Sequence, residues 1–498
     1  MLNPKEIKAL IDADRNSEKK QRAAIGQRYY EAQHDILSYR MFYFNDDGEL
    51  IEDTTSANNR ISHPFFTELS DQLAPYMLSF EENPIRAKLQ DPKAAAELQD
   101  HLDTYFDDDF WSEIGDLITG SYVKGVEYLY AYQNEDDRLA FQCADSMGVV
   151  EVREKDTDAG AACVLYWYTD RIDKGKKKII RIQEHTADSI AFYVQNGENG
   201  RIVRDDGIQP NPRPNVVYTD SEGNRYGKPL GFIPFWPLPL NKKQTSGLVP
   251  ITRIIDDYDM MKCGLSNNLQ DFDHPLYAVK GFDGNDFTEL AKNLRTKKMV
   301  GTGEQGGVDV VTTTIPVEAR KVNLEEDEKN IYRFGMGFNS SQVGDGNITN
   351  VVIRSRYTLL DLKADKVEKQ LKKMLKKIIR VVLEEINAEH GTAYLPGDVA
   401  VKFERIIPTN ESEDIENEHK KAQTKELQTN TILNVAASIG DEATLEAICE
   451  VMDWDLDKIK AQIKKAQEET PEAAEAILEQ VVTDDEQEAE AGPAVPAG

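Results

Sequence analysis

The feature of this sequence that most constrains its fold is a long amphipathic helix, predicted between about Tyr357 and Glu389. Apolar side chains recur there every three or four residues, a spacing typical of a helix with one buried face. The apolar stripe consists of Val367, Leu371, Leu375, Ile378, Val382 and Ile386. At ~1.5 Å per residue this helix is about 50 Å long, so several other elements must pack along it.

The same helix is basic although the chain as a whole is acidic. Between Arg354 and Arg380 there are ten basic and three acidic residues, whereas the 498-residue chain has a formal net charge of −30. The basic residues that lie largely off the apolar stripe are Lys366, Lys369, Lys373, Lys376, Lys377 and Arg380. Net acidity argues against a protein that coats nucleic acid, but not against one through which nucleic acid slides without adhering.

Three interpretations of the basic helix are open at this point. It is a solvated face with pairs four residues apart, such as Asp365 with Lys369. Alternatively, it pairs with an acidic face of a neighbouring chain, for which NLEEDEKN at residues 323–330 is a ready partner. In the third interpretation it faces DNA phosphates. The second and third interpretations are compatible in a ring-shaped assembly.

The segment before this helix, NSSQVGDGNITN at residues 339–350, is a loop by its composition. It contains one acidic residue, Asp345, and no basic residue. The next residues, VVIRSR, are rich in β-branched side chains, each of which disfavours a helix by roughly half a kcal/mol relative to alanine. We therefore expect a bend or hinge near Ile348–Ile353, and a regular helix from about Tyr357.

Several features argue against membrane, secreted and zinc-binding proteins. No apolar run approaches the ~18–20 residues that span a bilayer, and the N-terminal segment lacks the apolar core of a signal peptide. The histidines show no zinc-binding spacing, and no two cysteines form a CxxC pair. We expect four reduced cysteines, namely Cys143, Cys163, Cys263 and Cys449.

Motifs that could support catalysis or ligand binding are incomplete. GTGEQGGVD at 301–309 lacks the lysine and the following helix of a phosphate-binding loop, so we interpret it as a β-turn. The YFDDDFW cluster at 105–111 is interpreted as a solvated helix face or loop. NDDG at 45–48 and FDGND at 282–286 lack the acidic twelfth ligand of a calcium loop. We therefore expect no enzyme, no cofactor and no metal.

The N-terminal half is predicted to be helical first and β-rich later. Residues 1–45 are expected to be helical and residues 45–59 to form a polar loop. An amphipathic helix begins at Pro64, and another helix covers residues 95–119. From about Ser121 to residue 235, alternation of apolar and polar residues predicts antiparallel strands.

The middle of the chain is predicted to hold two helices flanking a small insert. Prolines 234, 237 and 239 exclude a central strand and suit an extended connector. A helix at 247–272, capped by Ser246 with Pro250 in its first turn, precedes an insert at 274–316 that contains strands and a short helix. The second helix covers residues 317–338.

The C-terminal part changes character again. Residues 408–465 are predicted to form a small helical unit. From Ala466 to Gly498 there are ten acidic residues and no basic residue, a composition typical of a disordered tail.

Four segments then follow one another in a recognisable order: NNRISHPFFTELSDQLAPYMLS, GFIPFWPLPLNKKQTSGLVPITRIIDDYDMM, EARKVNLEEDEKNIYRFGMGFN and IRSRYTLLDLKADKVEKQLKKML. In this order they resemble the portal proteins of tailed bacteriophages, the family typified by the portal of the Bacillus phage SPP1. The resemblance covers roughly residues 25–405, and the last 90 or so residues share only helical and acidic character.

The resemblance implies an α+β portal fold and divides the chain into the parts named in that family. These parts are a wing at 1–245, with N-terminal helices and then the β-rich part at 121–235; stem helices at 247–272 and 317–338; an α/β clip at 274–316; a tunnel loop at 339–350; the long helix and a return to the wing at 351–407; a helical crown at 408–465; and the acidic tail at 466–498.

The resemblance also implies candidate site residues. The DNA channel would be lined by the tunnel loop, namely Asn339, Ser340, Ser341, Gln342, Val343, Gly344, Asp345, Gly346, Asn347, Ile348, Thr349 and Asn350. The long helix would contact DNA or neighbouring subunits through Lys363, Lys366, Lys369, Lys373, Lys376 and Lys377. The clip would bind partners through Arg295, Lys297 and Lys298.

The function implied is that of a ring, usually a dodecamer, at one vertex of the phage head. Double-stranded DNA would be packaged, retained and ejected through its channel. The expected partners are the terminase, the major capsid or scaffolding protein and a head–tail adaptor, with no membrane. The expected location is the virion, and the host cytoplasm during assembly. Since the loop has no basic residue, we do not expect it to grip DNA tightly.

Two other functions are considered. Another ring-forming head–tail connector, without a role in DNA translocation, is disfavoured because such adaptors are usually much shorter. A nucleic-acid enzyme such as the terminase itself is disfavoured because the ATP-binding loop is missing, and an ATPase assay separates this alternative from the first two.

Overall fold

The computed structural model describes most of the chain, namely residues 1–45, 47–54, 56–134, 138–153, 160–173, 177–219, 225–271, 276–280, 306–311, 316–339, 350–406, 411–452 and 454–469. Helices make up 53% and strands 20% of the described residues, so this is a mixed α and β protein, as predicted. The chain divides into two compact units. The larger contains residues 1–345 and 354–407, and the smaller contains residues 346–353 and 408–498.

The N-terminus forms helices α1 (Pro4–Arg15) and α2 (Glu18–Tyr30), a short 3-10 helix η1 (Asp35–Ser38), and a hairpin of β1 (Phe42–Phe44) and β2 (Leu50–Glu52). The Asn3 side chain caps α1 by accepting from the backbone of Lys5 and Glu6. The prediction that residues 1–45 are helical is therefore wrong at β1. The turn decides this, because Asn45 Oδ1 accepts from two backbone N–H groups and closes the hairpin.

Helices α3 (Phe65–Asp71), α4 (Leu73–Met77), α5 (Pro92–Tyr105) and α6 (Asp108–Lys124) follow. The single helix predicted at 95–119 is thus two helices. Asp107 separates them, because its side chain accepts from the backbone N–H of Phe110 and caps α6. The α6 helix also continues past Ser121, where strands were predicted, and ends at Gly125 with a positive φ of 92°.

The β-rich part is antiparallel throughout, as predicted, but it extends from Val126 to Pro239. One sheet has the order β14–β4–β5, and a larger sheet has the order β10–β9–β8–β7–β6 with β11 also pairing to β9. The strands of the whole β-rich part are β4 (Val126–Gln133), β5 (Leu139–Ala144), β6 (Val149–Arg153), β7 (Ala161–Asp173), β8 (Lys177–His185), β9 (Ser189–Asn196), β10 (Ile202–Arg204), β11 (Arg213–Pro214), β12 (Val216–Thr219), β13 (Arg225–Lys228) and β14 (Phe235–Pro239). The proline-rich β14 is an edge strand, as the missing N–H groups of proline require.

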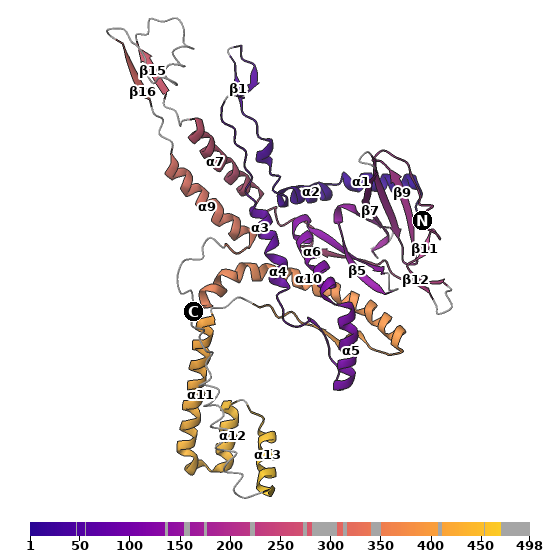
Figure 1. Ribbon diagram of the computed structural model, residues 1–498, viewed down its shortest axis with the longest axis vertical. Helices are drawn as coiled ribbons and strands as arrows, with labels where there is room; N and C mark the ends of the chain where they lie inside the picture. The colour runs from indigo at the N-terminus through magenta and orange to yellow at the C-terminus, as the bar shows by residue number, and fades with distance from the viewer. Residues whose placement is uncertain are drawn as a thin grey trace, which may run out of the picture. The chain divides into compact units, whose positions relative to one another are not determined.

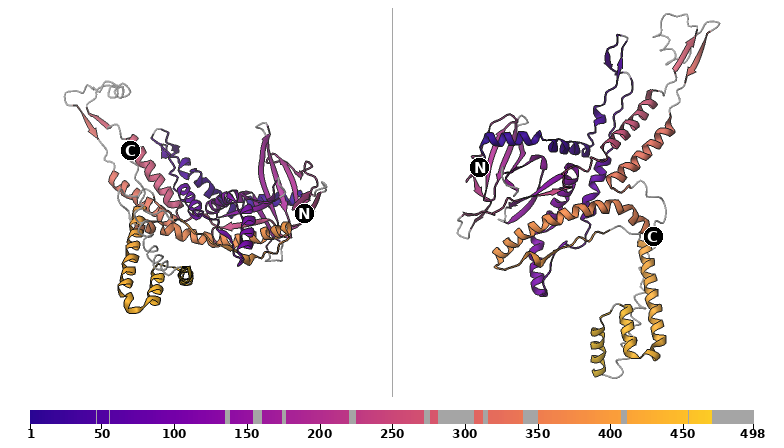
Figure 2. Two further views of the ribbon diagram at one scale, coloured as in Figure 1. Left: turned by 60° about the horizontal axis from the view of Figure 1, so that its bottom comes forward. Right: turned by 180° about the vertical axis from the view of Figure 1, so that it is seen from behind.

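Two helices, α7 (Thr252–Asp271) and α9 (Val317–Gly335), lie side by side, and Figures 1 and 2 show this pairing from several directions. Between them in sequence, β15 (Leu276–Lys280) pairs antiparallel with β16 (Gly307–Val311). The α7 helix begins later than the predicted residue 247, because residues 248–251 form turns whose first N–H donates to Ser246 Oγ. The short helix predicted in the insert lies outside the described residues.

An extended segment at residues 57–63 runs antiparallel to α7 and is bound along its length. Alternate backbone N–H groups of this segment donate to side chains four residues apart on the helix, in the pairs Ala57–Asp271, Asn59–Asn267, Ile61–Cys263 and His63–Asp259. Two residues of strand advance ~6.6 Å and four residues of helix ~6 Å, so the two repeats match. We call this segment the strap.

The longest helix, α10, runs from Asn350 to His390 and contains 41 residues. It is followed by η4 (Pro396–Asp398) and by β17 (Val399–Val401), which pairs with β3 (Ile85–Ala87). The predicted hinge is wrong over residues 350–353, which are already helical. The propensity cost of roughly half a kcal/mol for each β-branched residue does not exceed the roughly 0.5–1.5 kcal/mol that one continued backbone hydrogen bond contributes.

The smaller unit contains helices α11 (Glu411–Ile439), α12 (Asp441–Met452) and α13 (Leu456–Glu469). This agrees with the helical unit predicted at 408–465, except that α13 continues four residues into the predicted acidic tail. Residues 470–498 lie outside the described residues. None of the helices in the described part of the chain has the length and apolar character that a bilayer-spanning helix needs.

Candidate polyanion-binding surface on the long helix

The buried stripe of α10 fixes which way its basic residues point. All six predicted stripe residues are buried, with exposed fractions of 0–1%. At 3.6 residues per turn, the opposite face collects basic side chains within an arc of roughly 100°. These side chains are all exposed, and we call them the basic row: Lys366, Lys369, Lys373, Lys376, Lys377 and Arg380.

The three acidic residues of α10 that lie between Arg354 and Arg380 do not neutralise the basic row. Arg405, on the segment that returns along α10, forms ion pairs with Asp361, with Asp365 at 2.9 Å and with Glu368. The Arg405 side chain is only 11% exposed, so the three carboxylates converge on an almost enclosed guanidinium. The ion pair of Asp365 with Lys369, which was given above as an example for a solvated helix face, is not formed, because Asp365 pairs with Arg405.

As a consequence, the basic row has no carboxylate partner among the residues described. Only Lys372, at the edge of the row, pairs within α10, with Glu368 at 2.7 Å. Its ammonium also lies 5.8 Å from the centre of the Phe403 ring. The row is therefore a strip of uncompensated positive charge on a chain whose formal net charge is −30.

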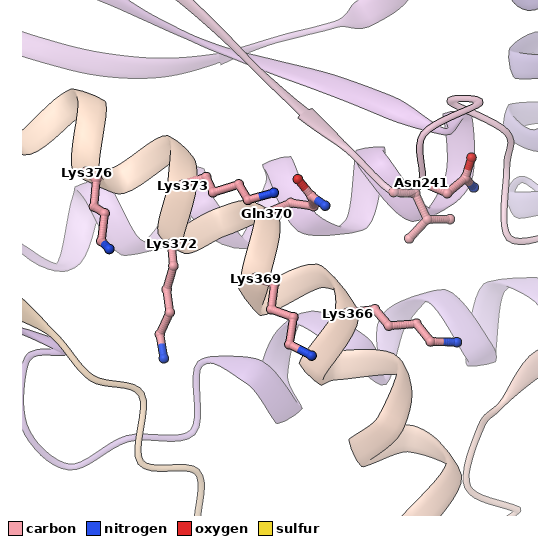
Figure 3. Close-up of a pocket in the computed structure, with 8 residues that line it drawn as sticks. Asn241, Lys366, Lys369, Gln370, Lys372, Lys373 and Lys376 are labelled. Carbon is pink, nitrogen blue, oxygen red and sulfur yellow. The ribbon is translucent and has the colours of Figure 1, made fainter.

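A recess of about 530 Å³ runs beside this strip. Figure 3 shows lysine side chains of α10 and Asn241 around it. The wall opposite α10 is formed by Leu240 and Asn241, and it is held by backbone bonds. Leu240 N donates to Gly125 O, and Asn241 Oδ1 accepts from the N–H groups of Lys243 and Thr245. The recess is thus a built feature of the larger unit.

Lys363 does not belong to this surface, which corrects its assignment as a contact for DNA or for neighbouring subunits. It is only 5% exposed, and its ammonium donates to the carbonyls of Leu69 and Gly335 at 3.3 Å each. It also lies 4.4 Å from the centre of the Tyr122 ring. Burial lowers the pKa of Lys363 to about 7. Its role in the described structure is to join α10 to the end of α9.

Most of the predicted tunnel loop, residues 340–349, lies outside the described residues, but the chain entering it is well fixed. Gln72 donates to Phe338 O at 2.8 Å and accepts from Phe338 N at 2.9 Å. The Phe338 ring stacks on Tyr357 of α10 with centroids 4.7 Å apart. Of the loop ends, Asn339 donates to Glu328 and Asn350 begins α10. The predicted clip residues Arg295, Lys297 and Lys298 also lie outside the described residues.

A buried charged cluster joins the N-terminal segment to α7, and sequence reasoning missed it. Asp259 is fully buried and accepts from His34 Nδ1 at 2.6 Å and from His63 Nδ1 at 2.7 Å. Burial alone would raise the pKa of Asp259, but the hydrogen bonds from the two histidines outweigh it and lower the pKa. No local motif indicates this cluster, since Asp259 lies about 200 residues from both histidines.

The cluster is not a metal site. Within the ranges described above, no group of three or more His, Cys, Asp or Glu side chains is placed to hold a metal ion. The acidic residues at 107–109 belong to the cap and first turn of α6. The candidate functional surface in the described part of the chain is the basic row of α10.

Comparison with known proteins assigns the fold to a family. Residues 11–476 match the family model described as phage portal protein, SPP1 Gp6-like, and the chain belongs to this family. The portal protein of Bacillus phage SPP1 is 25% identical over 350 residues, which are 70% of this chain and 66% of that protein, just under two thirds of its length. The portal protein of Clostridium phage phiCD119 is 25% identical over 404 residues, which are 76% of this chain and 82% of that protein.

These comparisons confirm the resemblance inferred from the four sequence segments, and the match extends beyond residues 25–405 at both ends.

Proposed function

We propose that this protein is the portal subunit of a tailed phage, which assembles into a ring at one capsid vertex and lets double-stranded DNA pass through the central channel. The observation that carries this proposal is the family match over residues 11–476. The paired helices α7 and α9 and the long α10 supply the framework that a channel needs. The role is that of a conduit that holds and releases DNA without catalysing a reaction.

The tunnel loop at 339–350 is the part proposed to meet the DNA. Both of its ends are attached to rigid elements, at Phe338 and at the start of α10. Its glycine- and asparagine-rich composition permits several backbone conformations, and it carries no basic residue. Such a loop would follow a passing duplex through weak contacts, because phosphate contacts by Lys or Arg are what make a protein adhere to DNA.

We propose the remaining parts of the portal on the same basis. The insert that contains β15 and β16 would be the clip, with Arg295, Lys297 and Lys298 available to dock the terminase or a head–tail adaptor. The smaller unit would be the crown, and the larger unit would face the capsid or scaffolding protein. We propose a dodecamer as the number of subunits.

The test is the mass of the purified 56.2 kDa chain in solution by light scattering, with negative-stain images of the same fraction. A ring of about a dozen subunits with a central hole is the expected result. Because some portals assemble only with capsid partners, the measurement is repeated at high protein concentration and with co-expressed scaffolding protein. A chain that stays monomeric under all three conditions would contradict the proposal. ATP hydrolysis by the purified chain would favour an enzyme instead.

A further inference from the structure

The basic row on α10 has no carboxylate partner among the described residues. Its six side chains are exposed, and the three acidic residues between Arg354 and Arg380 are bound to Arg405, while the other acidic residues of α10 follow the row from Glu384 on. Charged side chains at this density repel one another at ~5 Å spacing unless anions lie between or opposite them. The question is which polyanion fits the row.

The larger unit itself presents a complementary surface. Between residues 94 and 116 the sequence has eight acidic residues and no Lys or Arg. The apolar side of α5 is buried through Leu98 and Leu102, so the carboxylates point outward. Five of them are exposed and form no ion pair within the described residues, although Asp103 accepts hydrogen bonds from the side chains of Asn83 and Gln99. We call these five the acidic face: Glu97, Asp100, Asp103, Asp108 and Asp109.

The two surfaces match in spacing as well as in sign. Lys366, Lys369, Lys373 and Lys376 follow one another at intervals of three or four residues, which is ~4.5–6 Å along a helix. Glu97, Asp100 and Asp103 follow at intervals of three residues, which is ~4.5 Å. A carboxylate row and an ammonium row of similar pitch allow several ion pairs to form together when the helices lie alongside each other.

The acidic segment at 323–330, suggested above as a partner, is less suitable. On α9, Lys321 lies 4.0 Å from Glu325, Asn323 donates to Asp327, and Asn339 donates to Glu328. Burial first, and then the neighbouring Asp257, raise the pKa of Asp327 to about 6, so its charged form is less favourable there than that of an exposed carboxyl. Most of the acidic side chains of α9 are thus already in use within the stem.

DNA fits the row less well than a protein helix does. A recess of about 530 Å³ accepts protruding side chains, whereas a duplex presents a groove of ~12 Å width and needs an open face. The net charge of −30 also repels phosphates over a Debye length of ~8–10 Å. An acidic helix of the same chain is present at fixed stoichiometry.

We propose that the basic row of one copy binds the acidic face of α5 and α6 on a second copy. The two surfaces are different patches of the same chain, so the contact is heterologous and generates a closed ring or an open filament, depending on the rotation. This inference rests on the proposed ring and names the contact that holds adjacent subunits. The five lysines predicted to contact DNA or neighbours, apart from Lys363, then contact neighbours.

A charge-reversal and rescue experiment tests the proposal. One variant carries Lys369→Glu and Lys373→Glu, a second carries Glu97→Lys and Asp100→Lys, and a third carries all four substitutions. The matched control carries Lys5→Glu and Lys8→Glu, which reverse two exposed lysines on α1. Assembly is measured by light scattering and negative stain, folding by circular dichroism, and DNA content in heads assembled with each variant.

We expect each double reversal to lower the fraction of chain in rings at least tenfold, the fourfold variant to restore it, and the control to match the wild type. Rings that form normally in the first variant would overturn the proposal, and a loss of packaged DNA in those rings would assign the row to DNA. Failure of the fourfold variant to assemble, while its helices remain folded, would overturn the pairing of these two surfaces. A wild-type chain that forms no ring would instead refute the proposed function and this inference with it.

Discussion

At the scale of single residues, Arg405 decides the charge of a whole helix face. Its guanidinium lies 5.7 Å from the centre of the Tyr76 ring and binds three carboxylates of α10. Because a guanidinium offers five N–H donors in a planar fork, one arginine can serve several carboxylates at once. Because Arg405 holds these acids, the basic row of α10 has no carboxylate partner among the described residues.

Replacing Arg405 with alanine should therefore lower the free energy of unfolding by roughly 1–3 kcal/mol, between the values for exposed and buried ion pairs. Two of its partners are about half exposed, which places the effect below that of a fully buried pair. Arg405→Lys should recover part of the loss, since lysine supplies the charge without the fork. Urea titration of the larger unit measures both variants. No change in stability on removing Arg405 would show that the cluster is solvated.

Lys363 leads to a prediction about pH. Its pKa is about 7 in the folded chain, below the usual 10.5, because the side chain is buried. Between these two pH values the unfolded chain binds a proton that the folded chain has released, so stability rises with pH, by at most ~1.4 kcal/mol per pH unit. Below about pH 7 the lysine is charged in both states, and the destabilisation is complete and constant.

Urea titrations at pH 7 and pH 9 should show this rise in the wild type and a smaller rise in Lys363→Met. Cysteines and tyrosines also contribute to the change of unfolding free energy with pH, but they titrate in the wild type and in Lys363→Met alike, so their contribution cancels when the two proteins are compared. The exposed Lys366→Met serves as the control and should keep the wild-type slope. Equal slopes in all three proteins would mean that Lys363 keeps an ordinary pKa in the folded chain.

At the scale of elements, the strap shows how an extended segment outside any sheet can have its alternate backbone N–H groups hydrogen-bonded. Side chains of α7 take the place of a neighbouring strand and accept four alternate backbone N–H groups. The strap ends at His63, where the Asp259 cluster adds two histidine side chains. The hairpin of β1 and β2 is therefore anchored to α7 through the strap that follows it.

Asp259→Asn should destabilise the larger unit by about 2–4 kcal/mol at neutral pH, because the buried His34 and the half-buried His63 lose their shared carboxylate. The carboxyl pKa is lowered in the folded chain, so its contribution is present above about pH 4 and is lost as the pH falls through the folded pKa. The gap between wild type and variant should thus narrow in acid.

Asp257→Asn, on the same helix, is the matched control for this measurement. Asp257 contributes to the raised pKa of Asp327, so its removal should leave stability unchanged or slightly higher. If both variants lost stability equally, the effect would reflect the charge of α7 and not the histidine cluster.

The loop between α9 and α10 can be tested separately from the framework. Deleting residues 340–349 should leave ring assembly intact, because the described contacts of α9 and α10 lie outside the deleted segment. DNA packaging or retention should be impaired. A Gly-Ser linker of equal length in place of 340–349 separates the effect of sequence from that of length. Loss of rings in the deletion variant would contradict the assignment of this segment to the channel.

At the scale of the whole molecule, the division into two units predicts independent folding. A chain that ends at Ile407 keeps all of the larger unit. Its main unfolding transition should stay within a few degrees of that of the full chain, while calorimetry of the full chain should show an additional transition for residues 408–498. A fall of 10 °C or more in the truncated chain would mean that the larger unit depends on the smaller one.

The sequence by itself determined those features of the fold that depend on residues close together in the chain. The period of apolar side chains indicated α10 and its buried face, because residues three and four apart share a side of a helix. The alternating pattern indicated antiparallel strands, and the prolines excluded a central strand, although the extended connector predicted there is the edge strand β14. The order of four segments indicated the portal family, which the match over 11–476 confirms. The ends of helices were less predictable, since single caps such as Asp107 decide them.

Only the tertiary structure decided which charges are free and which are bound. Arg405 lies 37–44 residues from its partners, and His34 lies 225 residues from Asp259. Lys363 lies closer to the apolar stripe than Lys366 does, but the sequence does not show that two backbone carbonyls bury the first while the second is exposed. The physical reason is that periodicity and propensity act over one or two helical turns, whereas a charge is satisfied by whichever group the packing of distant segments brings beside it.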